Sequence, residues 1–97
     1  LEITKKSLNE FKCLDIPYGC KINLWKVEEP MPVNQFNTAK YFQDGKNPNE
    51  VLGFRSEIDE NIFKDFSKEI MSEGATILGG CCNVSPNYIN ALRSLKN

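Results

Sequence analysis

Apolar residues recur along this chain with two different periods, and each period predicts a type of element. Residues 2–14 carry apolar side chains on one helical side and polar ones on the other, which predicts an amphipathic helix that Pro17 prevents from continuing. Residues 18–24 alternate apolar with small or polar side chains, as a strand does. Residues 58–71 return to the helical period, and Gly74 stands where a left-handed residue commonly ends a helix.

The carboxyl-terminal part predicts one more strand and one more helix. Residues 75–78 are a short apolar run, typical of a strand buried on both faces. Ser85 is a suitable N-cap and Pro86 a suitable first residue for a helix over 86–96. Residues 25–56 follow neither period and are rich in proline, glycine and asparagine, so we interpret them as a long loop. Its aromatic residues either tie a surface loop to the body of the fold, the interpretation favoured here, or belong to a substrate-facing lid.

The predicted order is helix, strand, helix, strand, helix, which indicates the α/β class. Strands that alternate with helices are joined by crossovers and run parallel. Two parallel strands alone leave open edges, so we expect the 97 residues to be a slice of a larger α/β fold. A first residue that is Leu1 rather than Met agrees with this expectation.

Composition narrows the function classes. The 12 Lys and Arg residues against 13 Asp and Glu residues give a net charge of -1, which argues against nucleic acid as a partner. The sequence has no apolar run long enough for a membrane span, so no membrane partner is expected. Four cysteines without an apolar signal segment favour reduced thiols and a cytoplasmic location. Histidine is absent, which removes the commonest general base.

The segment that carries candidate chemistry is Gly79-Gly80-Cys81-Cys82. It is predicted at the carboxyl end of a parallel strand, in the turn before a helix, where α/β enzymes place their active sites. The two glycines are expected to give the backbone the freedom to aim both sulfurs at one centre. Thiolates are soft ligands suited to Zn²⁺.

Two thiols do not complete a zinc site, because catalytic zinc takes three protein ligands and keeps a fourth position open. Cys13 on the first helix and Cys20 in the first strand are the other thiols, and Cys20 is expected to pack as a small apolar residue. From these residues alone, Cys81 and Cys82 are either metal ligands or inert buried thiols.

Residues 73–92 resemble the carboxyl-terminal signature of the homocysteine S-methyltransferase family. The signature runs Gly-Ala, a few aliphatic residues, Gly-Gly-Cys-Cys, a polar turn, Pro, two residues, Ile, two residues and Leu, and all of it is present. Residues 17–23 are similar to the preceding strand of the family, which ends in Asn. Asn83 departs from the glycine that often follows the cysteine pair, and asparagine tolerates unusual turn dihedrals.

The resemblance implies that the chain is the carboxyl-terminal fragment of a single homocysteine-binding (β/α)₈ TIM barrel. Residues 1–97 would cover helix 6, strand 7, helix 7, strand 8 and helix 8, with strand 7 over 18–24 and strand 8 over 75–79. The family binds one zinc ion through three cysteines. Two match Cys81 and Cys82, and the third is expected upstream of Leu1, which leaves Cys13 and Cys20 without a role in the site.

The implied reaction moves a methyl group from a donor to the thiol of homocysteine and gives methionine. Coordination of the thiol by zinc replaces a general base, so the missing histidine is no objection. Gly79, Gly80 and Asn23 are expected to border the substrate, and no side chain of this chain is assigned as catalytic. Without the rest of the barrel, the fragment should be inactive, and oligomeric, partly molten or dependent on partners.

Two other classes stay open at this point. One is a small non-catalytic module in which Cys81 and Cys82 form a vicinal disulfide or join Cys13 and Cys20 around a structural metal. The other is an interaction domain with inert cysteines. Thiol titration with and without reductant distinguishes the non-catalytic module from a methyltransferase.

Overall fold

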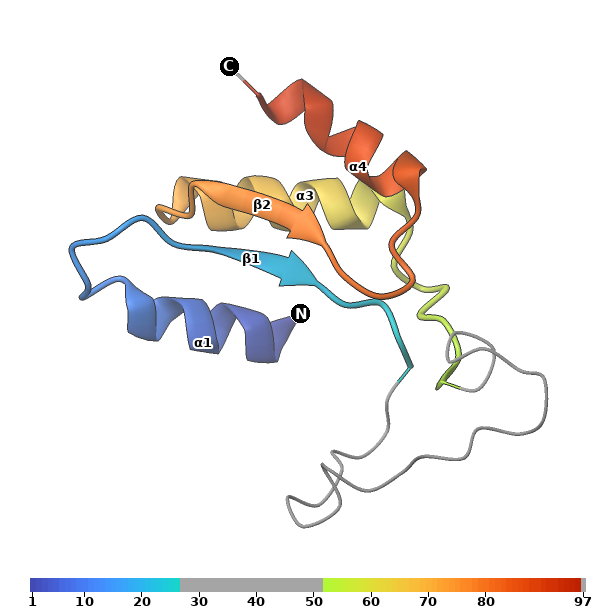
Figure 1. Cartoon of the computed structure of the whole chain (residues 1–97), viewed down its shortest axis with the longest axis horizontal. Helices are drawn as coiled ribbons and strands as arrows, with labels where there is room; N and C mark the ends of the chain where they lie inside the picture. Colours follow the sequence, from blue (N-terminus) through green and yellow to red (C-terminus); the bar gives the residue numbers. More distant parts are fainter. Residues whose placement is uncertain (27–51, 97) are drawn as a thin grey trace, which may run out of the picture.

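The computed structural model describes residues 1–26 and 52–96, in which helices precede, connect and follow two parallel strands (Figure 1). The elements are α1 (Glu2–Phe11), β1 (Gly19–Ile22), α3 (Glu60–Ser72), β2 (Ile77–Gly80), α4 (Pro86–Leu92) and a final 3₁₀ turn, η2 (Arg93–Leu95). The order of helices and strands confirms the prediction. Most of the expected loop, residues 27–51, lies outside the described residues.

The ends of the middle helix follow the sequence signals closely. Asp59 caps α3 by accepting a hydrogen bond at Oδ1 from the backbone N–H of Ile62, at 2.8 Å, so the helix begins two residues later than predicted. Gly74 follows the helix with a φ of 117°, as its position predicted. The hydroxyl of Tyr18 donates to the carbonyl of Glu73 at 3.0 Å, which ties the end of α3 to the start of β1.

The two strands pair in parallel, with Gly19 opposite Ile77 and Ile22 opposite Gly80. The prediction was wrong about the second strand, which covers residues 77–80 rather than 75–78. Residue 19 has to be a glycine, because a Cβ there would lie 1.8 Å from the carbonyl oxygen of Ile77. The register is therefore fixed by a close backbone approach in addition to the apolar pattern.

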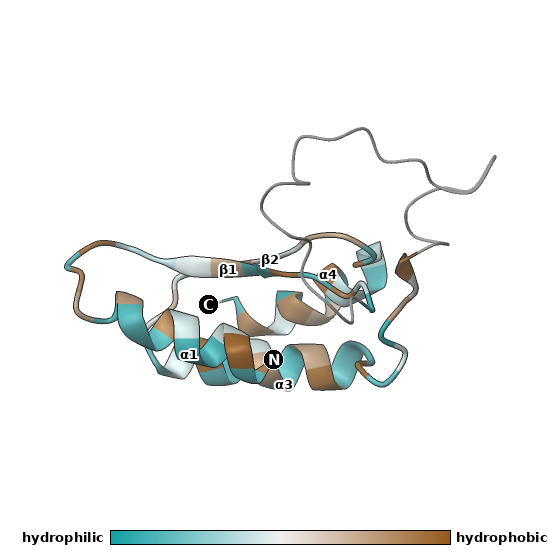
Figure 2. Cartoon of the chain, turned by 90° about the horizontal axis from the view of Figure 1, so that it is seen from below, coloured by the Kyte–Doolittle hydropathy of each residue, from teal (hydrophilic) through white to brown (hydrophobic). Residues whose placement is uncertain are grey.

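The helices lie on one side of the sheet, and no other described element covers the opposite sheet face (Figure 2). Between sheet and helices, Leu24, Phe63 and Ile70 are almost completely buried. On the uncovered side Lys21 is exposed and Ile77 keeps 58% of its surface accessible, so the apolar run is covered on one face and not on both as predicted. One covered face and two open strand edges are what a slice of a barrel wall presents.

Tyr88 anchors α4 in this core. Its hydroxyl donates to the carbonyl of Ile58 at 2.8 Å, and its ring meets that of Phe63 edge-on with 5.3 Å between centroids. Burial first, and then the carboxylates of Glu60 and Asp59, raise the pKa of its phenol. The contact explains why the beginning of α4 lies against the beginning of α3.

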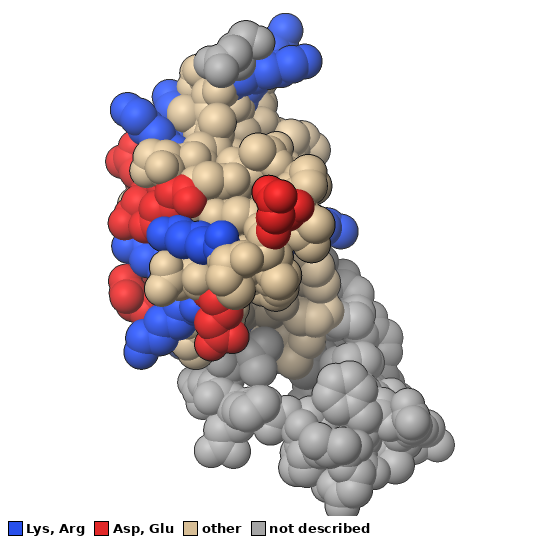
Figure 3. Space-filling view, turned by 90° about the vertical axis from the view of Figure 1, so that its left-hand side faces the viewer, with Lys and Arg blue, Asp and Glu red and all other residues tan. Residues whose placement is uncertain are grey.

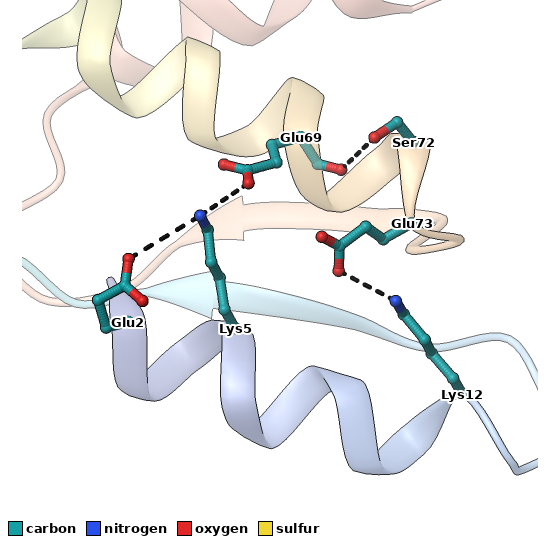
Figure 4. A network of polar contacts seen from close by, with 6 residues as sticks. All are labelled: Glu2, Lys5, Lys12, Glu69, Ser72 and Glu73. Atoms are coloured by element: carbon teal, nitrogen blue, oxygen red, sulfur yellow. Dashed lines mark hydrogen bonds and ion pairs between the residues drawn. The ribbon is translucent and has the colours of Figure 1, made fainter.

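Helix α1 is attached to the rest of the fold by one buried side chain and two ion pairs. Leu8 is its one buried residue. Lys5 and Lys12 reach across to α3 and its end, with 2.7 Å from Lys5 Nζ to Glu69 Oε1 and 3.2 Å from Lys12 Nζ to Glu73 Oε2 (Figure 4). The hydrogen bond with Glu69 raises the pKa of Lys5. Figure 3 shows Lys and Arg side chains interspersed with Asp and Glu side chains along one side of the molecule. Since the ion pairs are exposed to solvent, α1 is the most weakly attached helix.

Candidate functional site

The cysteine pair lies where the two parallel strands end. The chain leaves β2 at Gly80, and the backbone N–H of Cys81 donates to the carbonyl of Ile22 at 2.8 Å. The N–H of Leu24 in turn donates to the carbonyl of Cys82 at 3.0 Å. These two hydrogen bonds hold the cysteine backbone against the carboxyl end of β1, at the sheet edge where α/β active sites form.

A tight turn follows the pair, and its left-handed residue is Asn83, with a φ of 63°. The turn is closed by a bond of 3.3 Å from the N–H of Val84 to the carbonyl of Cys81. The side-chain amide of Asn83 donates to the carbonyl of Gly53 at 3.2 Å, so the turn is also tied to the segment before α3. Asparagine is one of the few residues that adopt this conformation readily. The sequence singled out Asn83 only as a departure from the family pattern, whereas the structure makes it the residue that turns the chain.

The prediction for Gly79 and Gly80 needs correction. Neither has the positive φ expected of a residue that bends the chain, and both lie in β2. A Cβ on Gly80 would lie 2.3 Å from Cγ1 of Val84, so this glycine leaves room for the chain to fold back after the turn. A Cβ on Gly79 would meet only Cγ of Lys21, at an ordinary 3.7 Å.

The two sulfurs lie 3.6 Å apart. This separation is far longer than a disulfide bond of about 2.05 Å. It is close to the edge of a tetrahedron with metal–sulfur bonds of about 2.3 Å, which is about 3.8 Å. The pair thus fits two corners of a zinc site. Cys81 is exposed and Cys82 half-buried, and burial together with Cys81 raises the pKa of the Cys82 thiol.

A comparison with family models shows to which family the chain belongs. Residues 11–95 match the model of the homocysteine S-methyltransferase family. The chain belongs to the homocysteine S-methyltransferase family. No curated protein matches the chain, and no solved structure does either.

The other two thiols lie away from the pair. Cys13 is exposed beyond α1, with its sulfur 3.1 Å from the carbonyl of Glu10. Cys20 in β1 packs against the core, and burial raises the pKa of its thiol. Within residues 1–26 and 52–96, no three Cys, Asp or Glu side chains gather into a metal-binding group. That Cys13 and Cys20 take no part in the site stays a prediction.

The remaining predicted site residue is Asn23, which is exposed just after β1. Its side-chain oxygen accepts a hydrogen bond of 2.9 Å from the N–H of Trp25, so that oxygen closes a turn. Trp25 also pairs with Phe54 in an isolated antiparallel bridge, and the N–H of Arg55 donates to the carbonyl of Leu24 at 2.9 Å. The two ends of the expected loop are therefore joined beside the site. No helix in the described ranges is long and apolar enough to cross a membrane.

Proposed function

We propose that this chain supplies two adjacent strands and the zinc-binding cysteine pair of a (β/α)₈ barrel that methylates the thiol of homocysteine. The observation that carries the proposal is the position of Cys81 and Cys82, with sulfurs 3.6 Å apart at the carboxyl edge of a parallel sheet. Family membership over residues 11–95 gives the reaction class. The third ligand of the zinc site is then a cysteine outside residues 1–97.

The chain's own groups hold and aim the two sulfurs. The backbone hydrogen bonds of Cys81 and Cys82 to the end of β1 fix their position, and the turn at Asn83 fixes their direction. Bound zinc supplies a Lewis acid that keeps a thiol ionised at neutral pH. In the reaction, the homocysteine sulfur forms a bond to the methyl carbon. The bond from that carbon to the donor breaks with its electron pair going to the donor, and the thiol proton goes to water.

The uncovered surfaces support completion by further barrel strands. Ile77 on the open sheet face and Ile3 on α1 keep 58% and 81% of their surface accessible. Each outer edge of the two-stranded sheet is free among the described residues. In a closed barrel such faces and edges are covered by neighbouring strands and helices. We therefore expect catalysis only from the chain together with the rest of the barrel.

The test is the zinc content of the complete barrel protein before and after Cys82→Ser. We expect about one zinc per barrel in the unchanged protein and a large loss in the variant, because a hydroxyl is a poor substitute for a thiolate ligand. Cys13→Ser is the matched control, since Cys13 lies apart from the pair, and should leave the zinc content as it is. Unchanged zinc in Cys82→Ser would overturn the assignment.

A further inference from the structure

Lys21 is the one cation on β1, and it lies on the uncovered face of the sheet. Its Cα is opposite that of Gly79 in the register. A Cβ built on Gly79 would lie 3.7 Å from Cγ of Lys21, so the lysine side chain runs along the face to which that Cβ would point. Gly79 has no side chain to block it. Lys21 thus projects from the side of the sheet that the helices leave open, one strand away from the residues that lead into the cysteine pair.

The charge of Lys21 has no counterion in the part of the chain that the structure describes. Every ion pair found there involves Lys5, Lys12 or Arg55. Among the described residues, Lys21 is therefore a cation without a counterion, opposite the strand that leads into the cysteine pair.

In the barrel proposed above, the open sheet face becomes the inside of the barrel. A cation there is favoured by an anion beside it, because transfer of an unpaired charge out of water is costly. An amino-acid thiol carries its own anion, a carboxylate a few bonds from the sulfur. A charge-assisted hydrogen bond from an ammonium to such a carboxylate is stronger than one between neutral groups.

We propose that Lys21 binds the carboxylate of homocysteine while the homocysteine sulfur lies at the Cys81–Cys82 pair. The assignment rests on the proposed function and adds a specificity determinant to it: the site selects a thiol that bears a carboxylate. An acidic side chain from another barrel strand is the competing occupant, and in that case Lys21 would be structural.

The test compares two ligands in the complete, zinc-loaded barrel protein. Homocysteine and 3-aminopropanethiol share the thiol, the chain and the amine, and only homocysteine has the carboxylate. Binding of each is measured by isothermal titration calorimetry for the unchanged protein, Lys21→Gln and Lys21→Arg. Lys68→Gln is the matched control, since Lys68 is exposed on α3, away from the open face.

We expect Lys21→Gln to weaken homocysteine binding about 10- to 100-fold, the loss of one hydrogen bond to a charged group. Binding of 3-aminopropanethiol should stay the same, and Lys21→Arg should restore most of the affinity for homocysteine. Equal weakening of both ligands, or no change for either, would overturn the assignment while leaving the methyltransferase proposal intact. Failure of the unchanged protein to bind homocysteine in a zinc-dependent way would overturn the proposed function itself.

Discussion

Replacement of each of the two neighbouring glycines of β2 by alanine distinguishes a role of the glycine in packing from a role in backbone flexibility. Gly80→Ala places a methyl group 2.3 Å from Cγ1 and 2.6 Å from Cβ of Val84. Both distances are shorter than a carbon–carbon contact allows, so Val84 has to move. Because Val84 is hydrogen-bonded back to Cys81, the movement is passed to the turn that holds the two sulfurs.

The size of the effect follows from a comparison with Gly79→Ala. Either substitution reduces the entropy of the unfolded chain, which stabilises the fold by about 0.4–1 kcal/mol. Only Gly80→Ala adds overpacking, which costs about 1–3 kcal/mol. The entropic contribution cancels in the difference between the two variants. We therefore expect Gly80→Ala to lower the free energy of unfolding by about 1–3 kcal/mol relative to Gly79→Ala.

The assay is thermal unfolding of the complete barrel protein, followed by circular dichroism, with zinc content measured beside it. For a chain of 150–250 residues, 1 kcal/mol corresponds to about 2–4 °C in Tm, so Gly80→Ala should melt about 2–12 °C below Gly79→Ala. Adding Val84→Ala should recover part of this loss, because it removes the methyl carbons but leaves Cβ at 2.6 Å. Equal melting temperatures and zinc contents for the two glycine variants would refute the reasoning.

Three further predictions concern the framework around the site. Gly19→Ala should prevent the strands from pairing in their present register, because the added Cβ would lie 1.8 Å from a backbone oxygen, and loss of the cooperative urea transition would show it. Tyr88→Phe should lower the free energy of unfolding by about 1–3 kcal/mol, since the carbonyl of Ile58 loses its buried donor, and an unchanged urea midpoint would contradict this. The raised pKa of Tyr88 means that the unfolded chain loses the phenol proton first as pH rises. The contribution of Tyr88 to stability is therefore complete below the ordinary phenol pKa of about 10 and declines at higher pH. Urea unfolding measured at several pH values should show a smaller decline for Tyr88→Phe.

Local sequence signals identified the elements because those signals act within a few residues. The apolar stripe of α3 and the positive φ of Gly74 depend on neighbours within one or two helical turns, and both were found in the structure. The cap at Asp59, which sets the first residue of α3, was not predicted. Pro86 likewise begins α4. Ser85 stands at the N-cap position as expected, although its side chain makes no capping hydrogen bond.

The limits of β2 and the mechanics of the cysteine turn could not be found in the same way. A run of four apolar residues has no period that marks where it starts or stops. The limits of the strand depend on its pairing with the neighbouring strand. Residues 77–80 pair with β1, so the strand includes Gly79 and Gly80. Because both glycines lie inside the strand, the left-handed residue of the following turn is Asn83.

The sequence by itself determined the alternation of helices and strands, the family, and the two thiols that stand together at a strand end. These depend on local periodicity and on a motif of contiguous residues. Only the tertiary structure decided that Cys13 and Cys20 lie apart from the pair, and that Lys21 faces the open side of the sheet. Contacts between residues far apart in the chain depend on the strand register and on which sheet face the helices cover. A shift of the register by one residue would move every side chain of a strand to the opposite face.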